Sequence, residues 1–206
     1  MADTTISYRD DVPVVTEEVV SVAAASDGII EPITLEEAKL QLREVLPDED
    51  DYVLSLITVA RQMAEGRLNR TLVRRQINRV FEGKVGDYRL FKPPFVSLDS
   101  VTLTDAYGAV VGEDSSYRVV MSGEIPILFP GYGLTWNPAL AQGGSLAVTY
   151  TVGYAPGEVP APIVQWMKLV IGTLYNNRET MSPGAQMFSM PDEFFKWLLQ
   201  PYMVYE

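Results

Sequence analysis

The stretch that decides the fold lies at residues 34–69 and reads TLEEAKLQLREVLPDEDDYVLSLITVARQMAEGRLN. It opens with a capping box, in which the Thr34 hydroxyl can accept a hydrogen bond from the Glu37 amide while the Glu37 carboxylate reaches back. Apolar residues then recur at helical spacing until Pro47 stops the first helix. A second apolar stripe follows and predicts a longer helix that ends near Asn69. The two helices are expected to form an αα-hairpin.

Beyond the hairpin, the spacing of apolar residues changes from helical to alternating, and Gly, Pro and Asp turns separate the alternating segments. Strands are predicted at 76–81, 88–91, 96–104, 117–121 and 146–154. Helical spacing returns at 163–175, where apolar residues cover so much of the circumference that we expect a buried helix. Pro191 and the two acids after it then open a short last helix.

This order of elements predicts an α+β fold. We expect a small helical bundle, made of the αα-hairpin and two C-terminal helices, with an antiparallel β insertion. A length of 206 residues suits one domain, or one domain with an appendage. The expected parts are an extended N-terminal arm at 1–32 and a main domain at 33–206, divided into a helical hairpin at 33–71, a β insertion at 72–155, and C-terminal helices and tail at 160–206.

The composition excludes many kinds of catalytic site. The chain has no Cys and no His, which rules out a disulfide framework, thiolate or imidazole metal ligands, a Cys nucleophile and a Ser-His-Asp triad. The sequence contains no complete cofactor-binding motif, so we expect no cofactor. The net charge of −11 disfavours general nucleic-acid binding through a basic surface. A metal-dependent nuclease would need carboxylates gathered from several elements, and the one acidic run at 48–51 does not show that.

Targeting and membrane signals are absent from the sequence pattern. The short apolar stretch at 19–25 follows two glutamates, which is the wrong flank for a signal peptide. The most apolar segment, 163–175, is shorter than the roughly 20 residues of a membrane helix and contains Gln165 and Lys168. We therefore expect a soluble protein made in a reducing compartment, with no membrane partner.

Charge is unevenly placed along the chain. Residues 61–92 hold nine bases and three acids, whereas residues 33–60 hold two bases and seven acids. One interpretation is a solvated face. The other is a subunit interface, in which the basic flank meets the acidic flank of another copy and the head-to-tail contacts close into a ring. The candidate interface residues are Asp48, Asp50, Asp51, Arg67, Arg70, Arg74, Arg75 and Arg79.

Aromatic residues gather near the C-terminal end. The last helix could dock on the domain core, and we favour that interpretation for Phe194 and Leu198. The segment after the helix continues with amphipathic aromatics, which are the residue types that anchor interfaces. The candidate partner contacts are Phe195, Trp197, Tyr202 and Tyr205.

Short motifs follow one another in a defined order across most of residues 33–202. They are Thr34–Lys39, Leu42-Arg43, Asp50-Asp51, Leu56-Ile57, Ala60-Arg61, Ala64-Glu65, Asn69–Leu72, Pro93–Val101, Tyr117–Val119, Val148–Tyr150, Gly153-Tyr154, Val159-Pro160, Leu174–Glu179, Leu198, Pro201 and Tyr202. Together they resemble the head–tail connector proteins (neck adaptor or head-completion proteins) of tailed bacteriophages and phage-like particles. Two departures stand out. Asn69 occupies a position where the family usually has Gly, and the acidic arm at 1–32 is longer than expected.

The resemblance implies a structural virion protein and not an enzyme, and it makes 33–206 a connector domain. Members of the family form a ring, typically of twelve copies, below the portal protein, and they offer a docking surface to the stopper or tail terminator protein. The ring extends the channel through which DNA passes without sequence-specific binding. We therefore expect a protein made in the cytoplasm of a bacterial host and located at the head–tail interface of the virion, with the C-terminal aromatics as portal or partner contacts. The alternatives are another neck or tail-tube component, a carboxylate–metal nuclease, and a generic binding module.

Overall fold

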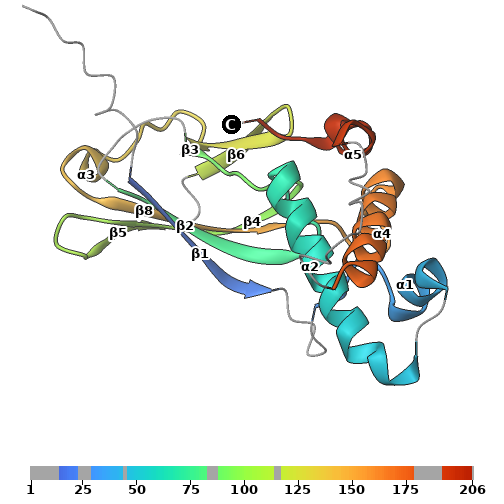
Figure 1. Cartoon of the computed structure of the whole chain (residues 1–206). Helices are drawn as coiled ribbons and strands as arrows, with labels where there is room; N and C mark the ends of the chain where they lie inside the picture. The colour runs from blue at the N-terminus through green and yellow to red at the C-terminus, as the bar shows by residue number, and fades with distance from the viewer. Residues whose placement is uncertain are drawn as a thin grey trace, which may run out of the picture. The chain divides into compact units, whose positions relative to one another are not determined.

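The computed structural model describes residues 14–22, 29–43, 46–82, 88–113, 117–178 and 192–205 (Figure 1). The chain forms two compact units. A helical unit takes residues 22–75, 91–95 and 152–206, and a sheet unit takes residues 1–21, 76–90 and 96–151. Among the helices in the described ranges, none is long and apolar enough to cross a membrane.

The helical unit contains the predicted hairpin and the two C-terminal helices. Its elements are α1 (Leu35–Leu42), η1 (Pro47–Glu49), α2 (Asp50–Leu68), α4 (Ala161–Asn176), α5 (Asp192–Leu199) and η3 (Gln200–Tyr202). The predicted capping box is present, because the Glu37 N–H donates to Thr34 Oγ1 at 3.2 Å and the Thr34 N–H donates to Glu37 Oε2 at 3.1 Å. α2 ends at Asn69, whose φ of 52° is left-handed. Asn tolerates this conformation better than most residues, which explains why it can stand where a Gly is expected.

One hydrophobic core fills the helical unit. α2 and α4 supply most of it, and Ile33, Ala38, Leu72 and Leu199 complete it. The fully buried residues of the two long helices are Val53, Ile57, Ala60, Ala64, Leu68, Ile163, Trp166, Met167 and Ile171. α4 buries one stripe and leaves Gln165 and Thr173 exposed, so it is less enclosed than its composition predicts.

The sheet unit holds two antiparallel sheets. The larger has the strand order β1 (Val14–Val22), β2 (Arg75–Glu82), β8 (Ser145–Val152), β4 (Phe95–Thr104) and β5 (Val110–Glu113). The smaller has the order β3 (Tyr88–Arg89), β7 (Ile125–Pro130) and β6 (Tyr117–Ser122), and the short helix α3 (Pro138–Ala141) precedes β8. β8 alternates strictly between buried and half-buried residues, as its sequence predicts. β1 lies within the predicted N-terminal arm and is an edge strand of the larger sheet.

The expected architecture, a small helical bundle with a β insertion, is wrong. The chain has a mixed α+β fold with two antiparallel sheets. The sheets form a compact unit, because alternate residues of several strands are buried and the Tyr88 ring packs edge-on against Phe81 and Trp136, with centroids 4.9 and 4.7 Å apart. The other buried apolar residues of the unit are Ile77, Leu90, Val101, Leu103, Leu128, Leu140, Leu146, Val148 and Tyr150.

Candidate functional site

The predicted acidic interface residues lie at the turn between α1 and α2. Asp48 and Asp51 are exposed, as is Glu36 on α1. Asp50 is half-buried and forms an ion pair with Lys39, which ties α1 to the start of α2. Negative charges here also favour α2, because they lie at the positive end of its dipole. We refer to Asp48 and Asp51 as the acidic pole.

Glu49, in the same turn, is held by the far end of α4. The Tyr175 hydroxyl donates to Glu49 Oε2, and Arg178 Nη2 donates to Glu49 Oε1 at 2.5 Å. The Arg178 guanidinium also lies over the rings of Tyr52 and Tyr175, at 4.8 and 4.7 Å from their centroids. These contacts hold the C-terminal end of α4 against the beginning of α2. The sequence indicates none of these contacts, since the partners are far apart along the chain.

The contacts of Glu49 with Tyr175 and Arg178 predict that the stability of the protein depends on pH. The Tyr175 hydrogen bond, and after it the Arg178 guanidinium, lower the pKa of Glu49 from its ordinary value of 4.5. A carboxylate with a lowered pKa contributes stability that is complete above pH 4.5 and is lost as the pH falls through the lowered value. We therefore expect the loss of stability in Glu49→Gln to be constant near neutral pH and to shrink below pH 4.5. Urea unfolding of both proteins over a pH series measures it.

The matched control is Tyr175→Phe, which keeps the ring under Arg178 and removes the hydroxyl that contributes most to the lowered pKa. Its acid-side loss of stability should be weaker than that of the wild type. A difference between wild type and Glu49→Gln that stays unchanged into strongly acidic solution would contradict the assignment.

The five predicted basic interface residues have different environments. Arg67 and Arg74 are exposed, and the Arg67 guanidinium lies 5.9 Å from the centre of the Trp166 ring. Arg70 is only 4% exposed, and Arg79 on β2 of the sheet unit is only 8% exposed. Arg75 is half-buried beside Glu65. Arg67 and Arg74 therefore form the accessible positive charge at the C-terminal end of α2, and we refer to them as the basic pole.

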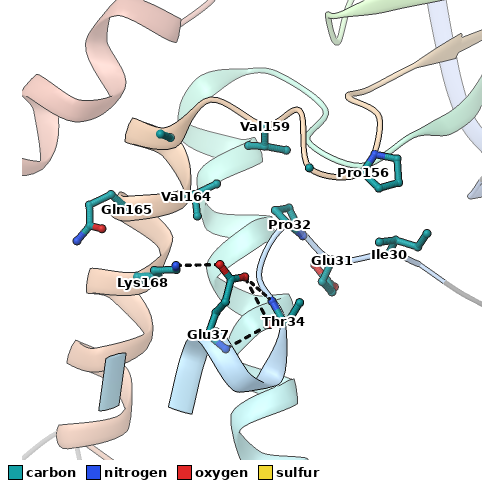
Figure 2. A pocket seen from close by; sticks show the side chains of 12 residues that line it. Ile30, Glu31, Pro32, Thr34, Glu37, Pro156, Val159, Val164, Gln165 and Lys168 are labelled. Carbon is teal, nitrogen blue, oxygen red and sulfur yellow. Dashed lines mark hydrogen bonds and ion pairs between the residues drawn. The ribbon is translucent and has the colours of Figure 1, made fainter. Parts of the chain in front are cut away.

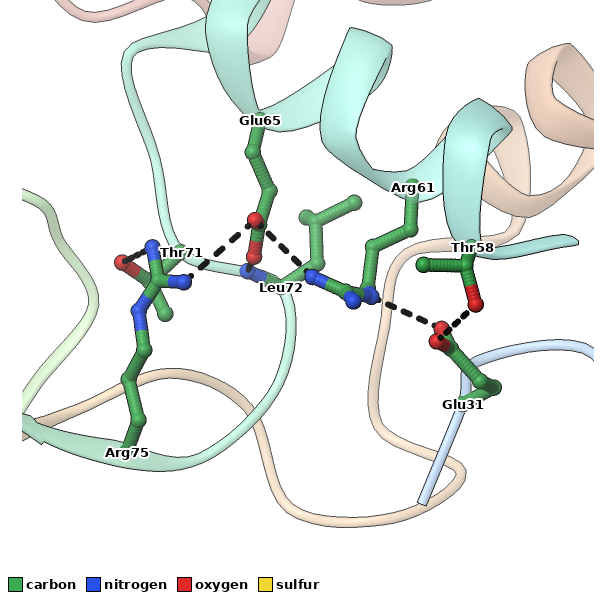
Figure 3. Close-up of polar contacts among 7 residues, drawn as sticks. All are labelled: Glu31, Thr58, Arg61, Glu65, Thr71, Leu72 and Arg75. Atoms are coloured by element: carbon green, nitrogen blue, oxygen red, sulfur yellow. Dashed lines mark hydrogen bonds and ion pairs between the residues drawn. The ribbon is translucent and has the colours of Figure 1, made fainter. Parts of the chain in front are cut away.

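A buried chain of charges explains why Arg75 faces inward (Figure 3). Glu65 Oε1 accepts a hydrogen bond from the Leu72 N–H at 2.8 Å. Glu65 Oε2 accepts one from Arg61 Nη1 at 3.2 Å and lies 3.6 Å from Arg75 Nη1. Arg61 Nε continues the chain to Glu31 at 2.8 Å. The network joins Glu31, which precedes α2 in the chain, and Arg75, which follows it, to the helix. It also gives the buried Leu72 N–H a hydrogen-bond acceptor.

The C-terminal aromatics divide into docked and exposed residues. Trp197 is 75% exposed and Tyr205 is 73% exposed. Tyr202 is half-buried, and its carbonyl accepts a hydrogen bond from Arg70 Nε. The Val204 N–H donates to the Leu68 carbonyl at 3.0 Å, so the tail runs along the end of α2. The backbone of Phe195 lies in α5.

A pocket of about 550 Å³ lies between α1 and α4 in the helical unit (Figure 2). It is lined by Ile30, Glu31, Pro32, Thr34, Glu37, Pro156, Gly157, Val159, Ala161, Val164, Gln165 and Lys168. Lys168 Nζ donates to Glu37 Oε1 at 3.2 Å, while Thr34 occupies the other oxygen of Glu37. The backbone hydrogen bond to Thr34 is the largest cause that lowers the pKa of Glu37. The polar lining thus serves the helix cap and an ion pair.

Within the described part of the chain, the carboxylates do not gather into a metal site. In the described ranges, no three or more Asp and Glu side chains lie close enough together to hold a metal ion. Of the carboxylates at 48–51, Asp48 and Asp51 are exposed to solvent, Asp50 pairs with Lys39, and Glu49 pairs with Arg178.

No protein-family model matches the chain, and no curated protein matches it. Solved structures of similar fold include a chain from the neck of an empty gene transfer agent (GTA) particle computed with C6 symmetry, which is 20% identical with a TM-score of 0.69 over 93% of this chain and 96% of that one. A chain from the virion of a native GTA particle is 20% identical with a TM-score of 0.70, over 92% and 96%. The protein has the fold of these chains. A chain from the neck of a native GTA particle computed with C12 symmetry is 17% identical with a TM-score of 0.63, over 93% and 96%.

Proposed function

We propose that this protein is a structural component of the neck of a phage-like particle, where copies form a ring below the portal and extend the DNA channel toward the tail. The observation that carries the proposal is the similarity of fold to GTA neck chains, which extends over 93% of this chain and 96% of the neck chain. A match of this extent includes both units and not one common motif alone. The sequence resemblance to head–tail connector proteins supports the same role independently.

Two features of the surface agree with this role. The acidic and basic poles lie at opposite ends of α2, as a head-to-tail ring requires of each copy. Trp197 and Tyr205 are exposed aromatic side chains of the kind that anchor protein interfaces. We assign these two residues to the contact with the portal or with the next neck protein.

Co-sedimentation with isolated portal rings of the same particle tests the proposal. We expect the chain to sediment with the portal and negative-stain images to show an added ring layer. Because central aromatic anchors contribute about 2 kcal/mol or more, the double variant Trp197→Ala, Tyr205→Ala should bind at least about tenfold more weakly.

Tyr107→Ala is the matched control, because Tyr107 is 96% exposed and lies in the sheet unit. It should bind the portal like the wild type. Binding to tails but not to portals would identify a tail-side component of the neck, and binding to neither by a folded chain would overturn the proposal.

A further inference from the structure

The two ends of α2 carry different kinds of surface. The helix has 19 residues, which corresponds to about 28 Å, so the acidic pole and the basic pole cannot meet within one copy. Apolar residues are exposed beside both poles. Protein interfaces have an apolar centre and a polar rim, and an exposed apolar patch beside charged residues has the same arrangement.

Beside the acidic pole lie three exposed leucines, which we call the leucine corner. Leu40 is 81% exposed, Leu46 is 64% exposed and Leu54 is 46% exposed. The Lys39–Asp50 ion pair and the hydrogen bond from the Glu49 N–H to the Leu46 carbonyl at 3.0 Å hold this turn together. Two exposed cations lie there as well, Arg43 and Arg178. Arg178 pairs with Glu49, so the exposed carboxylates of the acidic pole outnumber the remaining cation.

Beside the basic pole, α2 presents an apolar stripe made of Val59 and Met63. These residues are 40% and 45% exposed, and they lie four residues apart on one face. Arg67 continues the same row by another four residues. Between residues 62 and 75 the sequence has one acid, Glu65, and that residue is buried, so the exposed charge that this stretch contributes is positive.

We propose that the leucine corner of one copy packs against the Val59–Met63 stripe of a second copy, with the acidic pole of the first facing the basic pole of the second. The inference rests on the proposed ring and defines its subunit seam. Opposite charges select the pairing, and the exposed apolar side chains supply the buried centre. Since each copy carries both surfaces, the contact repeats head to tail and closes when the rotation permits.

Cysteine cross-linking tests the seam without background, because the chain has no Cys. In the double variant Leu40→Cys, Met63→Cys, a disulfide within one copy is excluded. The Lys39–Asp50 ion pair places Leu40 near the start of α2, and Met63 lies about 20 Å further along that helix, far beyond the roughly 7 Å Cα separation that a disulfide spans. We expect oxidation to give a ladder of trimers and larger species, whereas each single variant stops at dimers.

The matched control is the pair Leu40→Cys, Tyr107→Cys, in which the second cysteine is highly exposed but lies outside the proposed seam. It should give no more high-order species than random collision does. A ladder of equal intensity in this control would overturn the inference.

Charge reversal provides a second test of the pairing. In the double-cysteine background, Asp48→Lys with Asp51→Lys should slow cross-linking at least about tenfold, and Arg67→Glu with Arg74→Glu should do the same. A mixture of the two reversed proteins should regain cross-linking, because each now offers the charge that the other lacks. Circular dichroism confirms that each variant is folded, and no recovery in the mixture would contradict the pairing.

The cross-linking and portal-binding experiments distinguish a failure of the seam from a failure of the proposed function. Rings seen on portals without a ladder would show that the neck role holds and that the seam is wrong. A ladder without portal binding would support the seam and contradict the position below the portal. The absence of both would overturn both proposals.

Discussion

Replacing Gly153 by alanine is expected to destabilise the protein by at least about 3 kcal/mol. Gly153 has a φ of 101°, a conformation that side chains disfavour, and a Cβ there would lie 2.2 Å from the Val73 carbonyl oxygen. The neighbouring atoms are backbone and cannot rotate away. The Gly153 N–H also donates to the Pro94 carbonyl at 2.8 Å, which fixes the close approach. Urea unfolding followed by far-UV circular dichroism measures the loss.

Two other glycines of the helical unit separate the causes of this effect. Gly157 has a φ of 79° but open space around its missing Cβ, so Gly157→Ala should cost only the conformational strain of about 1–2 kcal/mol. Gly172 lies in α4 with nothing within 4 Å, and Gly172→Ala should stabilise the protein by up to about 1 kcal/mol. If Gly153→Ala lowers the free energy of unfolding by no more than Gly157→Ala does, the Val73 backbone does not lie as close to residue 153 as described.

Glu65→Ala is expected to cost about 3–5 kcal/mol, because it breaks a buried network by removing one partner. The change leaves the Arg61 guanidinium, whose side chain is 4% exposed, without one of its two carboxylates. It also removes the acceptor of the Leu72 N–H. Glu65→Gln should lose less, about 1–3 kcal/mol, since the amide oxygen can still accept from that N–H. Equilibrium unfolding in urea measures both.

Gln62→Ala is the control for Glu65, because Gln62 is an exposed residue of the same helix. Its effect should lie within about 0.5 kcal/mol. A double-mutant cycle with Arg61→Ala should give a coupling of about 0.5–3 kcal/mol between Arg61 and Glu65. If the two single losses simply add, the ion pair contributes nothing beyond the separate side chains.

Local patterns predicted the helices of this protein well. The Thr34 capping box and the end of α2 at Asn69 follow from neighbours within one turn of helix. The predicted end of the first helix at Pro47 is wrong, because α1 already ends at Leu42 and Pro47 opens η1 instead. Alternation in β8 likewise predicted its buried residues. The misjudged feature was the place of the strands in the architecture. Strand pairing joins distant segments, as β2 and β8 show, and no local pattern reveals that the strands form two sheets in a compact unit.

The candidate interface divides in the same way. Sequence by itself determined that acids gather at the start of α2 and bases at its end, and that no site of this chain uses a thiolate or an imidazole of its own. Only the tertiary structure decided which charges are accessible. Arg70 is buried because the carbonyl of Tyr202, 132 residues away, accepts its hydrogen bond, and Arg75 faces Glu65. The exposure of Leu40 was equally hidden in the sequence, since burial depends on which distant segments cover a side chain, and periodicity reports only the neighbours along one element.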